Sequence, residues 1–127
     1  MIRLFSILLL TLFPLICFGD YQWKLITESN NGDFYVDMET LTIKGNKRFF
    51  LRLRDYKEMD EYGERSNIIH FETDCDSYES RFLTDIYFED HMGKGKSKVL
   101  NELGDWTTFK DGSVGHYFIE VVCSLKK

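Results

Sequence analysis

The stretch 48-RFFLRLRDY-56 carries the clearest strand pattern in the chain and sets the fold class. Phe49, Leu51 and Leu53 point to one side of an extended backbone, and the arginines point to the other. A period of two is typical of a β-strand in a sheet whose two faces differ. We expect the side that carries the arginines and Phe50 to be exposed to solvent.

Segments on both sides of this stretch repeat the pattern and predict a single antiparallel sheet of five or six strands. Clusters rich in Asn, Gly and Asp separate the segments, which favours tight hairpins between neighbouring strands. Aromatic residues make up 16% of the chain, and such residues are enriched in strands. The expected strands cover residues 21–28, 34–36, 42–44, 48–56, 66–75 and 81–88.

The end of the chain changes from a period of two to a helical period. Ser113 is a typical N-cap residue, and the apolar positions after it recur with i, i+3, i+4 spacing. The sequence therefore predicts an α+β fold, with a C-terminal helix of about three turns packed on one face of the sheet. The apolar positions are Val114, Tyr117, Phe118, Val121, Val122 and Leu125.

The first nineteen residues have the pattern of a secretory signal peptide. Arg3 is the only charged residue before Asp20, and an apolar run that is short for a membrane span follows it. A cut after Gly19 would leave one domain over residues 20–127. The alternative is an amino-terminal anchor helix that is not removed.

The cysteines favour a disulfide in an exported protein. A cut after Gly19 removes Cys17, and the bulky Ile16 before Cys17 disfavours lipidation. Cys75 and Cys123 then remain as a pair in an oxidising compartment, where disulfides persist. The alternative is two buried free thiols in a protein that is not exported.

Short motifs recur along nearly the whole of residues 20–127. In order and spacing they resemble the surface-adhesin protein E family of bacterial secreted proteins. The motifs are Trp23-Lys24-Leu25-Ile26, Gly32, Tyr35-Val36-Asp37, Asp55-Tyr56-Lys57-Glu58, Phe71 to Cys75, Met92-Gly93-Lys94-Gly95, Trp106, Gly112-Ser113-Val114-Gly115 and Val122-Cys123.

The resemblance implies a small antiparallel sheet with a C-terminal helix tethered by a disulfide. It also implies export to the periplasm, the outer-membrane surface or the extracellular medium, and binding to extracellular-matrix proteins or epithelial surfaces. We therefore expect a protein partner. The alternative is a soluble periplasmic protein that binds a small ligand or an envelope partner.

The sequence lacks the motifs of an enzyme, a metal site or a cofactor site. No two histidines have metal-ligand spacing, and no nucleophile elbow or phosphate loop is present. A metal could be shared near one strand end by Asp85, Glu89, Asp90 and His91, but a solvated strand end is the simpler interpretation. Without residues 1–19 the formal net charge falls from −5 to −6, which disfavours nucleic-acid binding. We expect a binding protein that has no cofactor, no metal and no transmembrane segment after export.

The candidate binding surface is the basic aromatic side of the 48–56 strand together with the loop that follows it. Arginine and tyrosine are enriched in protein interfaces. The alternative is a solvated face whose arginines pair with Glu72 and Asp74 on the neighbouring strand. The candidate residues are Arg48, Phe50, Arg52, Arg54, Tyr56 and Tyr62.

Overall fold

The computed structural model describes residues 20–100 and 103–127. The expected signal peptide, residues 1–19, lies outside the described residues. No helix in the described part of the chain is long and apolar enough to span a membrane. The elements are β1 (Trp23–Ser29), β2 (Gly32–Asp37), β3 (Thr42–Lys44), β4 (Lys47–Asp55), β5 (Ser66–Asp74), β6 (Glu79–Phe88), the 3-10 turn η1 (His91–Gly93), β7 (Ser97–Leu100), β8 (Thr107–Thr108) and α1 (Val114–Ser124).

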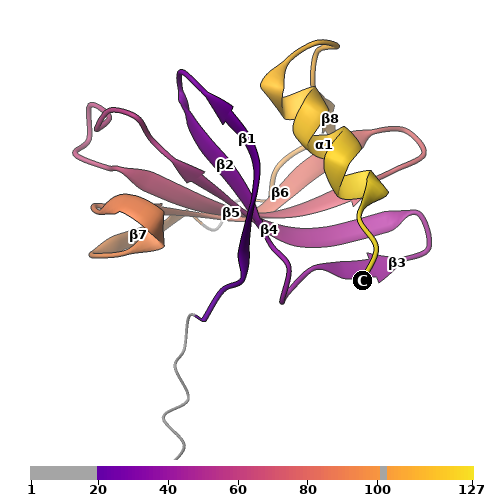
Figure 1. Ribbon diagram of the computed structural model, residues 1–127, viewed down its shortest axis with the longest axis horizontal. Helices are drawn as coiled ribbons and strands as arrows, with labels where there is room; N and C mark the ends of the chain where they lie inside the picture. Colours follow the sequence, from indigo (N-terminus) through magenta and orange to yellow (C-terminus); the bar gives the residue numbers. More distant parts are fainter. Residues whose placement is uncertain (1–19, 101–102) are drawn as a thin grey trace, which may run out of the picture.

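The strands form one antiparallel sheet that curls around α1 (Figure 1). Its main path runs β1-β2-β4-β5-β6-β7, while β3 pairs with β4 and β8 pairs with β6. The described residues thus contain eight strands, so the prediction of five or six was too low. The missed strands, β7 and β8, are short, and each of their residues is exposed. A strand without a buried side has no hydrophobic alternation to reveal it.

The predicted C-terminal helix is confirmed as α1. The Ser113 hydroxyl accepts a hydrogen bond from the His116 backbone N–H, as expected of an N-cap. Gly115 allows the helix to approach its neighbours closely, because a Cβ there would collide with the Phe109 ring. The helix packs on one side of the sheet, which we call the helix face.

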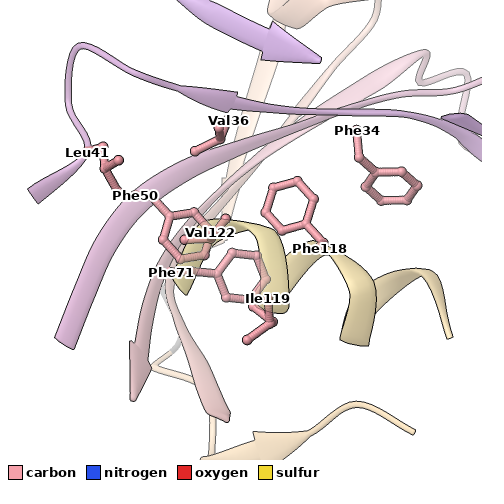
Figure 2. Close-up of a cluster of buried hydrophobic side chains, with 8 residues drawn as sticks. All are labelled: Phe34, Val36, Leu41, Phe50, Phe71, Phe118, Ile119 and Val122. Atoms are coloured by element: carbon pink, nitrogen blue, oxygen red, sulfur yellow. The ribbon is translucent and has the colours of Figure 1, made fainter. Parts of the chain in front are cut away.

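The main core lies between α1 and the helix face (Figure 2). Phe50 and Phe71 stack with ring centroids 5.6 Å apart, and the Phe118 ring lies 6.0 Å from that of Phe50. The buried cluster comprises Phe34, Val36, Leu41, Phe50, Phe71, Phe118, Ile119 and Val122.

A second group of buried apolar side chains lies on the opposite side of the sheet, which we call the outer face. Leu53 is fully buried there and pairs in register with Ile68. The turn η1 covers both side chains, since Gly93 packs directly on Ile68. Strand β4 therefore buries apolar side chains on both faces.

The predicted disulfide is confirmed. Cys75 and Cys123 are bonded, with Cα atoms 5.7 Å apart and a sequence separation of 48 residues. The bond joins the end of β5 to the last turn of α1. It fixes the helix to the sheet at the carboxyl end of the helix.

Candidate functional site

The basic aromatic residues of β4 share one face, but that face is the one that α1 covers. Phe50 is only 1% exposed and lies in the main core, so its placement on an exposed surface was wrong. The arginines at 48, 52 and 54 are half-buried around the edge of that core. The alternation of β4 could not show this, because both of its faces bury apolar groups.

Arg48 has a structural role. Its terminal guanidinium nitrogens donate to the backbone oxygens of Gly45 and Lys47, and a longer hydrogen bond of 3.5 Å reaches the Cys123 carbonyl. A cation at this place satisfies carbonyls at the end of α1. Arg48 thus joins the β3–β4 turn to the helix.

The expected pairing of the arginines with Glu72 and Asp74 is wrong. By register, Arg48 lies opposite Thr73, and the two acidic residues belong to the outer face. There Glu72 pairs with Arg81 at 2.8 Å, and Lys47 lies within 3.7 Å of Glu72 and 3.6 Å of Asp74. The acidic residues of β5 are therefore engaged away from the helix face.

Arg54 and Tyr56 form a fixed pair beyond the core. Two nitrogens of Arg54 donate to the Asn31 backbone oxygen at 3.0 and 2.9 Å. The guanidinium carbon lies 4.9 Å from the centre of the Tyr56 ring. Burial raises the pKa of Tyr56 to about 12, so its hydroxyl stays protonated and can act as a hydrogen-bond donor.

Arg52 differs from its two neighbours. Its guanidinium carbon lies 5.4 Å from the Phe34 ring centre and 5.3 Å from that of Phe71. Its Nε, like that of Arg48, is buried without a hydrogen-bond partner in the part of the chain that the structure describes. Burial, with a smaller effect of the nearby Arg54 charge, lowers the pKa of Arg52 to about 10. The side chain is still charged at neutral pH.

A buried polar network lies beside these arginines on β5 and β6. Asn67 is 4% exposed and Asp85 is 8% exposed, and the Asn67 amide donates to the Asp85 carboxylate at 3.2 Å. Burial and a hydrogen bond with Asp85 raise the pKa of Tyr87. Sequence analysis considered Asp85 only as a metal ligand and did not single out Asn67 or Tyr87. Their signal in the sequence is that Asn67 alternates with the apolar Ile69 and Phe71 on one side of β5, and Asp85 lies opposite Ile69.

The loop between β4 and β5 holds Tyr62 in an exposed position. The Asp60 carboxylate accepts the backbone N–H groups of Tyr62 at 3.0 Å and Glu64 at 2.8 Å. Tyr62 is 78% exposed. Burial and the neighbouring Asp60 carboxyl raise the pKa of Glu64. The loop is therefore an ordered turn with an aromatic side chain at its tip.

Two open clefts flank the loop. One, of about 320 Å³, lies between the β1–β2 turn and residues Arg54 to Asp60. The other, of about 350 Å³, lies between the loop and the β6–β7 edge. Figure 1 shows this end of the sheet projecting away from α1. We call this region the uncovered patch; it comprises the residues that line the two clefts, Asn30, Asn31, Arg54, Tyr56, Lys57, Glu58, Asp60, Tyr62, Glu64, Tyr87, Lys98 and Leu100.

The side chains that could ligate a metal lie in separate parts of the described structure. Asp85 lies in the network above, whereas His91 contacts Asp55 at 3.0 Å near η1. His116 on α1 lies 3.2 Å from Glu120. Within residues 20–100 and 103–127, no three metal-ligating side chains come together. The uncovered patch instead combines tyrosines, carboxylates and the cationic side chains of Arg54, Lys57 and Lys98, which suits recognition of a polar surface.

Comparison with known proteins agrees with this architecture. Two similar solved structures are crystal form II of Haemophilus influenzae protein E and protein E from non-typeable Haemophilus influenzae. The first is 12% identical, with a TM-score of 0.63 over 80% of this chain and 87% of that one. The second is 12% identical, with a TM-score of 0.60 over 79% of this chain and 75% of that one. At this identity the likeness establishes the fold.

A comparison with curated protein sequences finds no match. The family described as Surface-adhesin protein E matches residues 23–124, which is most of the sequence and all of the helix and sheet. The chain belongs to the surface-adhesin protein E family.

Proposed function

We propose that this protein is an exported adhesin that binds an extracellular protein through the uncovered patch and has no catalytic activity. The partner would be an extracellular-matrix protein or a protein of an epithelial surface, as expected for the family. The observation that carries the proposal is the exposed, ordered Tyr62 beside two open clefts. A tyrosine side chain on an ordered loop offers a large contact area at a low cost in conformational entropy.

The composition of the patch supports protein recognition over binding of a small apolar ligand. Its clefts are open to solvent and lined mainly by polar and aromatic side chains. Small-molecule sites are instead concave and mostly apolar. Leu100 is 47% exposed and adds an apolar contact next to Tyr62 in the second cleft. A protein partner can cover both clefts and the loop between them.

The test replaces exposed side chains of the patch and compares them with exposed side chains of the same types elsewhere. We expect the double variant Tyr62→Ala, Leu100→Ala to lose at least about tenfold in affinity for decellularised matrix, because central aromatic contacts dominate interfaces. The control is Tyr21→Ala, Leu25→Ala, whose side chains are 40% and 45% exposed outside the patch. Binding is measured by capture of the purified protein on matrix-coated plates.

Both double variants should keep the melting midpoint of the wild type, since all four side chains are exposed. Equal affinity of the patch variant and the wild type would contradict the proposal. So would a loss of affinity in the control variant alone. Release of the protein by osmotic shock, with no protease-accessible material on intact cells, would favour a periplasmic partner instead.

We also propose that residues 1–19 are a signal peptide that is removed after Gly19, leaving a domain over residues 20–127. The pattern of one basic residue, an apolar run and a small residue supports this cut. We expect the exported protein to begin at Asp20, as measured by its intact mass. A mass that includes an acyl group on Cys17 would contradict the cut and indicate a lipid-anchored protein.

A further inference from the structure

We propose that the free edge of β7 pairs with an extended segment of the partner protein, which adds one strand to the sheet and places an acidic side chain opposite Lys98. This inference rests on the proposed function, because it names how the partner meets the uncovered patch. It goes further in assigning recognition to the backbone of one strand.

Strand β7 is the last strand on the main path of the sheet, and its far side pairs with no strand of the described residues. Figure 1 shows β7 at the end of the sheet away from α1. The other end of the path is β1, whose pairing with β2 is interrupted by a bulge between Leu25 and Thr27. A bulge twists an edge strand and hinders further pairing. The register of β7 with β6 is uninterrupted, so β7 is the edge that suits an added strand.

The hydrogen bonds between β6 and β7 determine which backbone groups of β7 are free. The Glu89 N–H donates to the Lys96 oxygen at 3.0 Å, so these two residues form a hydrogen-bonded pair next to β7. In an antiparallel ladder such pairs recur at every second residue, which includes Lys98. The N–H and C=O groups of Ser97 and Val99 therefore point away from β6. They offer two donors and two acceptors to an added strand.

The side chains of β7 suit an added strand on both faces of the sheet. Lys98 and Leu100 line the cleft between the loop and the β6–β7 edge. Val99 lies on the outer face by register and is 47% exposed. A strand bonded to Ser97 and Val99 brings alternate side chains next to Lys98 and Leu100, and the side chain between them next to Val99. The backbone thus holds the segment, and the cleft selects its side chains.

A second copy of this chain is a poor occupant of the same edge. Consider two β7 strands that pair antiparallel across a two-fold axis, in the register that uses Ser97 and Val99 of both copies. This register places the two Lys98 side chains directly opposite each other, and like charges at such positions destabilise a strand pair. Lysines on edge strands are a common protection against self-association. The edge therefore favours a strand of a different protein.

The partner residue opposite Lys98 is expected to be acidic. The two residues would form a pair of the type without hydrogen bonds, in which side chains are closest and opposite charges stabilise the pairing. Asp60 and Glu64 line the same cleft, but no carboxyl group in the described ranges is within ion-pair distance of Lys98. The Asp60 carboxylate is instead held by two backbone N–H groups of its loop. The Lys98 ammonium is therefore available to a carboxylate of the partner.

The experiment follows the backbone amides of β7 by NMR in the purified exported protein. The probe is the acetylated and amidated pentapeptide Val-Val-Glu-Thr-Thr, which can pair antiparallel with residues 96–100 and place its glutamate opposite Lys98. We expect saturable shifts of the Ser97 and Val99 amides and slower hydrogen exchange at both. Absence of a saturable shift at these amides would overturn the inference. Self-association of the protein through β7 without peptide, measured by analytical ultracentrifugation, would also overturn it.

N-methylated peptides test the backbone contacts without changing a side chain. Methylation of the second valine and the first threonine, whose N–H groups face β7, should weaken binding at least about tenfold, because two hydrogen bonds are lost. Methylation of the first valine and the glutamate, whose N–H groups face away from β7, should leave the affinity unchanged. Equal affinity of the two methylated peptides would contradict pairing through the backbone.

A proline variant makes the corresponding change in the protein. Val99→Pro removes the N–H that faces the added strand and spares the ladder with β6, so it should weaken peptide binding at least about tenfold. Slow exchange of the Lys98 amide shows whether β7 stays paired. The matched control, Val99→Thr, keeps the N–H and should bind as the wild type does. Wild-type affinity of Val99→Pro would overturn the inference, and if the proline disturbs β7 the methylated peptides still decide.

A charge exchange tests the acidic side chain opposite Lys98. Lys98→Glu should weaken binding of the probe, and so should a lysine in place of the glutamate of the probe. The two changes together should restore the affinity, because the opposite charges are present again. Equal affinity in all four combinations would contradict the placement of a carboxylate opposite Lys98.

Capture on matrix-coated plates distinguishes failure of this inference from failure of the proposed function. If Val99→Pro is captured as well as the wild type while the Tyr62→Ala, Leu100→Ala variant is not, the inference fails and the proposed function stands. If the wild type is not captured but its Ser97 and Val99 amides respond to the pentapeptide, the proposed function fails and strand addition at β7 stands.

Discussion

Replacing both bonded cysteines, Cys75→Ser with Cys123→Ser, is expected to lower the free energy of unfolding by about 2–5 kcal/mol. The bond closes a loop with a sequence separation of 48 residues, so its loss frees a large part of the unfolded chain. In a domain of this size the melting midpoint should fall by about 10 °C or more. Thermal unfolding followed by circular dichroism measures the shift.

The order in which α1 and the strands lose protection from hydrogen exchange provides a second measurement on the same variant. Without the bond, the end of α1 is held by the core side chains Phe118 and Val122 and by the Arg48 contact with the Cys123 carbonyl. The strands β4 and β5 keep their full ladder of paired residues. Amide hydrogen exchange should therefore accelerate in α1 before it does so in these strands. A midpoint within about 2 °C of the wild type, or free thiols in the native exported protein, would contradict this account.

The substitution Phe50→Ala is expected to cost about 3–5 kcal/mol, the largest effect of a single side chain on β4. Phe50 is 1% exposed and contacts both Phe71 and Phe118, so its removal leaves a cavity between sheet and helix. Urea titration of the folded protein measures the loss. The result decides between a core residue and the exposed residue that the sequence pattern suggests.

The adjacent residue provides a matched control. Phe49 lies on the outer face of the same strand, is half-buried and has the Lys44 ammonium 5.6 Å from its ring centre. We expect Phe49→Ala to cost no more than about 2 kcal/mol, since less apolar area is removed from contact. An equal or larger cost for Phe49→Ala would mean that the assignment of the two faces of β4 is reversed.

Local patterns were enough to predict the main elements of this fold. Two of the signals, the alternation in residues 48–56 and the cap at Ser113, depend only on neighbours in the sequence. The third signal is the number of cysteines left after the expected cut, which is two. The structure bears out the antiparallel sheet, the C-terminal helix and the Cys75–Cys123 bond. Strands β7 and β8 were missed because they are short and exposed on both sides.

The site could not be predicted to the same extent, because it depends on which face of the sheet the helix covers. Phe50 and Leu53 are both buried although they point to opposite sides of β4, so the pattern alone does not identify the core side. The contact of Asn67 with Asp85 requires the register between β5 and β6, which joins residues far apart in sequence.

The claim that the uncovered patch is the recognition surface is tested most directly by hydroxyl-radical footprinting of the purified protein, free and bound to decellularised matrix. We expect binding to reduce the labelling of Tyr62, Tyr87 and Leu100, which lie along the cleft between the loop and the β6–β7 edge. Labelling of the exposed Leu25 and Trp106, outside the patch, should not change. Reduced labelling of Leu25 or Trp106, with Tyr62 and Leu100 unaffected, would contradict the account.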